Sequence, residues 1–135
     1  KEGDGMQIVM DGITYHLRVK FDTIIREFHI DDGKNADYML SGFYQRDLIG
    51  TYYDYTLDVE PDPQNPADYD AFYEAISAPI NYHSITMPYG QSTITFNAMV
   101  TSGRDTYRGK IAERNRWNGM RLIFTAVEPY REPTT

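Results

Sequence analysis

The sequence contains no cysteine, and none of its runs of apolar side chains is longer than three residues. The absence of cysteine excludes disulfide scaffolds, cysteine-ligated metal centres and thiol catalysis, and it leaves the redox compartment open. A membrane-spanning helix needs about 20 mostly apolar residues and a signal-peptide core about 7 to 15. The sequence therefore predicts neither element and no membrane partner.

Basic residues are also scarce. Against 20 Asp and Glu there are 13 Lys and Arg, which gives a net charge of −7. A protein that binds duplex nucleic acid needs a basic face to neutralise phosphates, so we expect no sequence-specific nucleic-acid binding.

The residues that are abundant favour β-strands. Aromatic side chains make up 14% of the 135 residues, and aromatic and β-branched residues fit a pleated, half-buried surface. A chain of this length can bury a core without metals or disulfides. We expect one domain over 1–135, with an ordered core at 6–129 and tails at 1–5 and 130–135.

Alternation of apolar and polar residues predicts two hairpins. In the first, residues 6–10 precede the turn dipeptide Asp11-Gly12, and apolar residues then alternate with polar ones over 13–22. The second joins residues 82–87 to 92–101 through the turn 88–91. Further strands are expected at 24–30, 38–46, 48–60 and 120–127, whereas 102–115 is expected to be extended or irregular.

One helix is predicted at about 66–77. Asn65 suits the N-cap and Pro66 the first helical position, and apolar residues follow with helical spacing until Pro79. The fold class is therefore α+β and predominantly β, an antiparallel β-sandwich or small barrel with one flanking α-helix. The predicted core comprises Ile13, Tyr15, Leu17, Val19, Phe21, Tyr53, Tyr55, Leu57, Phe72, Ile76, Phe96 and Phe124.

Residues capable of catalysis or metal binding do not have the sequence spacing of a known type of site. His16, His29 and His83 each lack a second ligand two or four residues away. Five acidic residues, which we call the acidic string, have a spacing that does not match a calcium-binding loop. We assign them to the solvent-exposed face of a strand and to the first turn of the helix. This string comprises Asp58, Glu60, Asp62, Asp68 and Asp70. We predict no catalytic, cofactor-binding or metal-binding residues, no cofactor and no enzymatic activity.

A basic window from 104 to 121 stands out from the acidic remainder. It holds six basic and two acidic residues, a net charge of +4, whereas the rest of the chain carries −11. Three interpretations remain open: a solvated loop, a stacking surface for single-stranded bases with Tyr107 and Trp117, and an arm that docks on an acidic face of a second copy. We favour self-association, through an arm that is mobile in the isolated subunit because little holds it to its own core. The candidate interface residues are Arg104, Arg108, Lys110, Arg114 and Arg116.

Three segments resemble a family of small proteins encoded in bacterial prophages. They are residues 50–56 (GTYYDYT), 69–79 (YDAFYEAISAP) and 87–92 (MPYGQS), and the resemblance extends over residues 6 to about 129. It implies a virion component that belongs to the tail and is found in the virion and in the bacterial cytoplasm during assembly. Its partners would be copies of itself and other phage tail proteins.

The predicted order of elements is similar to that of phage tail-tube and tail-completion proteins, in which a β-sandwich or barrel carries a helix and an extended hairpin or loop. Folds alone do not determine function. The alternative is a β-rich binding module that holds a glycan or peptide on exposed aromatic rings. The residues expected to do so are Tyr52, Tyr82, Tyr89 and Trp117.

Overall fold

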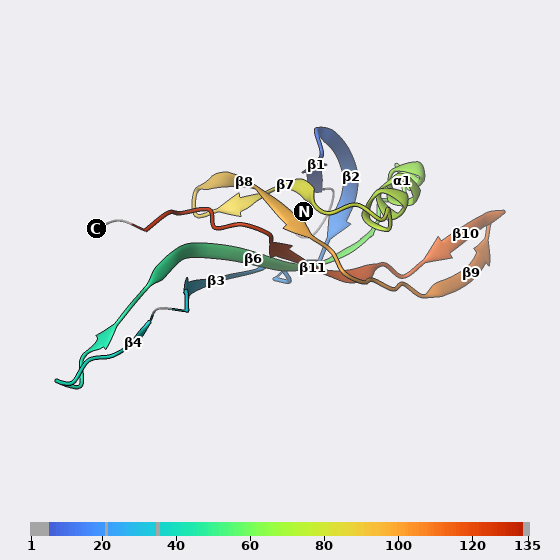
Figure 1. Cartoon of the computed structure of the whole chain (residues 1–135). Helices are drawn as coiled ribbons and strands as arrows, with labels where there is room; N and C mark the ends of the chain where they lie inside the picture. Colours follow the sequence, from blue (N-terminus) through green and yellow to red (C-terminus); the bar gives the residue numbers. More distant parts are fainter. Residues whose placement is uncertain (1–5, 21, 35, 134–135) are drawn as a thin grey trace.

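The computed structural model describes residues 6–20, 22–34 and 36–133, and most of these residues lie in β-strands (Figure 1). A single helix, α1 (Pro66–Ile76), is present in this part of the chain. The strands are β1 (Met6–Met10), β2 (Ile13–Val19), β3 (Ile25–Asp32), β4 (Asp37–Tyr38), β5 (Tyr44–Gln45), β6 (Leu48–Pro61), β7 (His83–Tyr89), β8 (Ser92–Met99), β9 (Tyr107–Ile111), β10 (Arg114–Trp117) and β11 (Met120–Ala126).

Six antiparallel strands close into a small barrel in the order β1-β2-β6-β11-β8-β7. Closure depends on β6, which pairs with β2 along one edge and with β11 along the other. β3 adds a seventh strand on the same edge of β6 as β2. The predicted fold class, α+β and predominantly β with one flanking helix, is confirmed in its barrel form.

Both predicted hairpins are present. Asp11 and Gly12 join β1 to β2 with positive φ angles of 55° and 79°, as a tight two-residue turn requires. β7 and β8 are paired up to Tyr89 and Ser92, so their turn contains Gly90 and Gln91 instead of four residues.

The hydrophobic core, formed by the barrel strands and α1, contains ten of the 12 predicted core residues. Ile13 is the exception among the described residues, because it begins β2 directly after the turn, at the rim of the barrel, and is 53% exposed. Phe21 lies outside the described residues.

The predicted strand at 38–46 is wrong. The segment folds back on itself, with β4 and β5 pairing as a two-stranded tip. Gly42 has a φ of 91° and the Met39 amide donates to the Phe43 carbonyl at 2.6 Å, so a turn interrupts the apolar run.

The predicted tail at 130–135 also needs correction. The Thr51 amide donates to the Arg131 carbonyl, and the Tyr130 amide donates to the Thr51 carbonyl, both at 2.9 Å. The Tyr130 ring packs edge-on against Tyr53 at a centroid distance of 6.0 Å. Residues 130 and 131 therefore belong to the ordered domain.

Helix α1 covers the barrel with one apolar face. Phe72 is fully buried and meets the Tyr15 ring edge-on at 5.4 Å. Asp68 accepts a hydrogen bond from the His16 amide at 2.7 Å, which fixes the first helical turn against β2. Asn65 precedes the helix as predicted, but its side chain donates to Asp62 at 3.1 Å instead of capping the helix.

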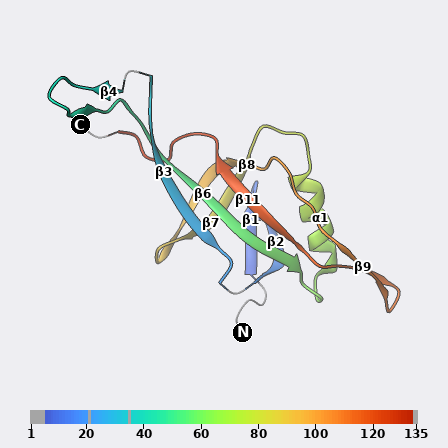
Figure 2. The same cartoon turned by 90° about the horizontal axis from the view of Figure 1, so that it is seen from below.

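The barrel carries two projections at opposite ends (Figures 1 and 2). At one end, β3 and the first half of β6 continue beyond the barrel and lead to the β4–β5 tip. We call residues 25–49 of this projection the ribbon, which comprises β3, the β4–β5 tip and the first two residues of β6. At the other end, β9 and β10 form a separate two-stranded sheet.

Replacing Phe72 with Ala should lower the free energy of unfolding by about 3 to 5 kcal/mol, because it leaves a cavity between α1 and β2. Tyr73→Ala is the matched control: Tyr73 lies on the same helix but is exposed, so a much smaller loss is expected. Denaturant unfolding measures both values. A loss below about 1 kcal/mol for Phe72→Ala would contradict the packing described here.

Candidate functional site: a basic hairpin and the cleft beside it

The basic window forms a β-hairpin, whereas residues 102–115 were expected from the sequence to be extended or irregular. Its turn is made by Ala112 and Glu113, whose φ angles are 53° and 66°. Non-glycine residues adopt this conformation at a cost of about 1–2 kcal/mol each. Ring contact between Tyr107 and Trp117, with centroids 5.1 Å apart, supports the pairing. The sequence did not predict this turn, because it lacks the Asn and Gly residues that are common in two-residue hairpin turns.

The base of the hairpin is attached to the rest of the molecule. The Tyr69 hydroxyl on α1 donates to the Asp105 carboxylate at 2.8 Å, and the Asn118 amide donates to the Thr106 carbonyl at 2.9 Å. Burial, together with this bond to Asp105, raises the pKa of Tyr69, so the hydroxyl keeps its proton and remains a donor. The expectation that little holds this segment to its own core is therefore wrong at its base.

The connection from the hairpin to β11 requires a glycine. Gly119 has a φ of 100°, and a side chain at this position would collide with the Val59 carbonyl and with Glu60. Gly119 thus allows the chain to leave β10 and pass close to β6.

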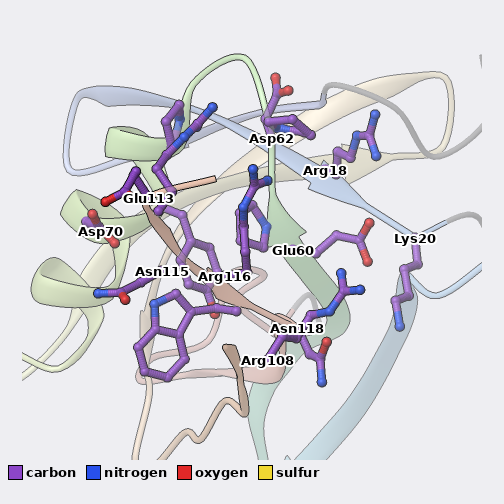
Figure 3. Close-up of a pocket in the computed structure, with 16 residues that line it drawn as sticks. Arg18, Lys20, Glu60, Asp62, Asp70, Arg108, Glu113, Asn115, Arg116 and Asn118 are labelled. Carbon is purple, nitrogen blue, oxygen red and sulfur yellow. The ribbon is translucent and has the colours of Figure 1, made fainter. Parts of the chain in front are cut away.

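A cleft of about 670 Å³ separates the hairpin from the barrel and α1 (Figure 3). Figure 3 shows Glu113 and Asn115 on one side of the cleft and Arg18 and Lys20 on the other. The connection between β6 and α1 forms a third wall, which includes Pro61, Pro63 and Pro66.

Charged groups of both signs line this cleft. Its cations come from β2 and from the hairpin, and its carboxylates come from all three walls. The lining cations are Arg18, Lys20, Arg108, Arg114 and Arg116, and the lining carboxylates are Glu60, Asp62, Asp70 and Glu113. Such a surface suits a partner that has charged groups of its own. A charged side chain of the cleft that is desolvated on binding needs an oppositely charged group on the partner.

The structure brings together three of the five predicted interface residues. Arg108, Arg114 and Arg116 line the cleft, whereas Arg104 and Lys110 lie outside it. The Nε atom of Arg116 is buried and has no hydrogen-bond partner among the residues that the structure describes. A buried donor without an acceptor costs about 1–3 kcal/mol, so an acceptor supplied from outside would be favoured.

The acidic string is divided among separate partners and does not gather around a cation. Asp58 binds Arg121 at 2.9 Å, and Asp68 contacts the His16 ring at 3.0 Å. Asp62 accepts hydrogen bonds from the Gln64 amide and the Asn65 side chain, which lower its pKa. Within the described ranges, no three metal-ligating side chains lie close enough to share a cation.

Each histidine is paired with aspartate. His83 is 3% exposed and donates to Asp11 at 2.6 Å. His29 donates to Asp31 at 2.7 Å and stacks on Tyr52 at 5.0 Å. The bond to Asp31 raises the pKa of His29 despite partial desolvation, and Asp54 acts in the same direction. Local spacing could not reveal the His83–Asp11 pair, whose members are 72 residues apart.

The aromatic residues predicted to hold a glycan or peptide differ in their surroundings. Tyr82 is exposed as expected, but Tyr52, Tyr89 and Trp117 are partly buried. Tyr89 lies under the Arg26 guanidinium and shares a hydroxyl contact of 3.1 Å with Tyr53. The four residues belong to different elements: Tyr52 lies in β6, Tyr82 precedes β7, Tyr89 ends β7 and Trp117 ends β10.

No protein-family model matches the chain, and no curated protein matches its sequence. The prophage resemblance therefore depends on the three segments alone. None of the helices in the described part of the chain is long and apolar enough to span a bilayer.

Replacing Tyr69 with Phe should loosen the hairpin without disturbing the core, because only the hydroxyl donor is lost. Hydrogen bonds to charged acceptors contribute about 1.5–3 kcal/mol, and each 1.4 kcal/mol corresponds to a factor of about ten in an opening equilibrium. We expect amide exchange in β9 and β10 to accelerate about tenfold or more, with the barrel amides unchanged. Tyr73→Phe, on the exposed face of α1, should leave both regions unchanged. Equal exchange in the two variants would show that the Asp105 contact does not hold the hairpin.

Proposed function

We propose that this protein is a structural subunit of a phage or prophage virion, a tail component that assembles with copies of itself and with neighbouring tail proteins. The observation that carries the proposal is the pair of projections at opposite ends of the barrel (Figure 1). One projection is rich in apolar side chains and the other in cations. A subunit with unlike surfaces at its two ends is suited to heterologous contacts, which generate rings or filaments.

The exposed apolar residues support an interaction role. Of the 20 exposed large apolar side chains in the described part of the chain, ten lie in the 25-residue ribbon. Monomeric proteins rarely expose apolar groups at this density, and concentrated patches mark interaction sites.

The assignment to a phage tail is supported by the sequence resemblance and by charge. The three resembling segments coincide with the middle of β6, with helix α1 and its C-terminal flank, and with the β7–β8 turn, so the resemblance concerns the barrel and its helix. Outside the basic window the chain carries a net charge of −11. An acidic wall would allow DNA to pass through a tube without binding to it, because like charges prevent phosphate contacts.

Reversing three hairpin charges should weaken self-association. We expect the Arg104→Glu, Arg108→Glu, Arg114→Glu triple variant to raise the dissociation constant at least tenfold, with a nearly unchanged thermal midpoint, because exposed charges contribute little to folding. Sedimentation and light scattering across protein concentration measure this change. About 1 M salt should mimic the substitution, since it shortens the Debye length to about 3 Å.

The matched control replaces the same three arginines with lysine and keeps the net charge. Its association should stay close to that of the parent. Assembly of the Glu variant at the parental concentration would remove the hairpin from the interface. A parent that stays monomeric at every concentration and binds a glycan or peptide would favour the binding-module alternative.

The virion assignment has a direct biochemical test. Particles released after induction of a host that carries the gene should contain this chain in a fixed copy number relative to the major tail protein, as measured by quantitative mass spectrometry of gradient-purified virions. A mock-induced culture processed in parallel is the control. Recovery of the chain only in the soluble fraction would contradict a role in the virion.

A further inference from the structure

We infer that the ribbon of one copy is the docking site for the basic hairpin of the next copy. This inference depends on the self-association proposed above, and it assigns the two surfaces that meet. Both surfaces belong to this chain, and they lie at opposite ends of it (Figures 1 and 2).

The ribbon has an apolar face with no cover. In the β3–β6 register, Phe28 is opposite Tyr53 and Ile30 is opposite Thr51, so these side chains lie on the face of the sheet that forms the barrel core farther along β6. Within the barrel that face is buried. On the ribbon, Phe28 is 67% exposed and Ile30 is 43% exposed.

The tip of the ribbon extends this apolar surface. Met39, Leu40 and Phe43 are all exposed around the β4–β5 turn. Burying apolar surface yields roughly 25 cal/mol per Å², so removing these side chains from water provides the main driving force for a contact.

β3 is also an edge strand, although its Ile30 carbonyl already accepts a hydrogen bond from the Arg46 side chain at 3.3 Å. It is the last strand of the barrel sheet, and in the described ranges no strand pairs with its outer edge. Unpaired amides and carbonyls on an edge strand are a template for another strand. The hairpin of a second copy, which consists of the two strands β9 and β10, can supply such a strand.

Net charge favours the hairpin of another copy, and not a second ribbon, as the partner that docks on the ribbon. Residues 25–49 contain three basic and five acidic side chains, a net charge of −2, whereas residues 104–117 contain five basic and two acidic, a net charge of +3. Contact between two ribbons would bring like charges together, whereas contact between ribbon and hairpin joins opposite ones.

The hairpin offers a face that matches the ribbon in composition. The register places Ile111 opposite Arg114 and Gly109 opposite Arg116, so one face carries Ile111 together with two arginines that also line the cleft. Ile111 is exposed. This combination of apolar and cationic groups complements the apolar and acidic groups of the ribbon.

The experiment uses one variant for each surface in the full chain. The hairpin variant is Arg108→Glu, Arg114→Glu. The ribbon variant is Phe28→Ser, Leu40→Ser, Phe43→Ser, and all three of its positions are exposed. Its matched control is Ile13→Ser, Ile80→Ser, Ile123→Ser, which removes three similarly exposed apolar side chains outside both projections.

We expect the hairpin variant and the ribbon variant each to stay monomeric at concentrations where the parent and the control assemble. An equimolar mixture of the two variants should form a heterodimer and nothing larger, because the mixture retains one intact ribbon and one intact hairpin that can meet. Sedimentation velocity with one variant fluorescently labelled measures this, and circular dichroism confirms that both variants remain folded.

Several outcomes would overturn the inference. Dimers of the hairpin variant alone would indicate contact between two ribbons. Parental assembly of the ribbon variant, or a mixture that stays monomeric, would show that the ribbon does not receive the hairpin. In these cases the parent still assembles and the proposed function survives, whereas a parent that never self-associates would end both proposals.

Discussion

The structure depends on strand β6, because this single 14-residue strand closes the barrel and also pairs with β3 in the projection that carries the ribbon. Its second half pairs with β2 and β11, which joins the two ends of the barrel sheet. Its first half pairs with β3 beyond the barrel, and the Thr51–Arg131 bridge covers part of the opposite edge. Tyr55 and Leu57, at the middle of the strand, are fully buried. One continuous strand therefore connects the barrel core to the ribbon.

Local patterns in the sequence were sufficient for the elements whose pairing is also local. Asp11-Gly12 and the alternation that follows it predicted the first hairpin, and the apolar spacing from Tyr69 to Ile76 predicted α1. The sequence-based prediction failed where burial or pairing depends on residues far away in the sequence. Ile13 continues the alternation but lies at the rim, and the apolar run at 38–46 folds into a tip because Gly42 permits a turn. Tyr130 was predicted to lie in a tail, since nothing local shows that it pairs with β6.

The candidate site, like the fold, could be predicted from the sequence only in its local features. Net charge over a window identified the basic residues, because charge is a property of composition. Their arrangement required the Ala112-Glu113 turn, which lacks the usual turn residues, and the Tyr69–Asp105 bond, which spans 36 residues. Three arginines consequently meet in one cleft, whereas Arg104 and Lys110 lie outside it. The aspartate partners of His16 and His83 are similarly distant in sequence, 52 and 72 residues away.

The two projections differ in how they are anchored, and this difference bears on assembly. The ribbon is a continuation of barrel strands, so its direction is set by the core. The hairpin belongs to a separate sheet and is attached at its base through the Asp105 and Thr106 contacts. In the proposed assembly, the direction of the ribbon would be set by the barrel, whereas the direction of the hairpin would be set by the contacts at its base. A closed ring would require every such contact to have the same geometry, so the angle between successive subunits would depend on how the hairpin is held at its base.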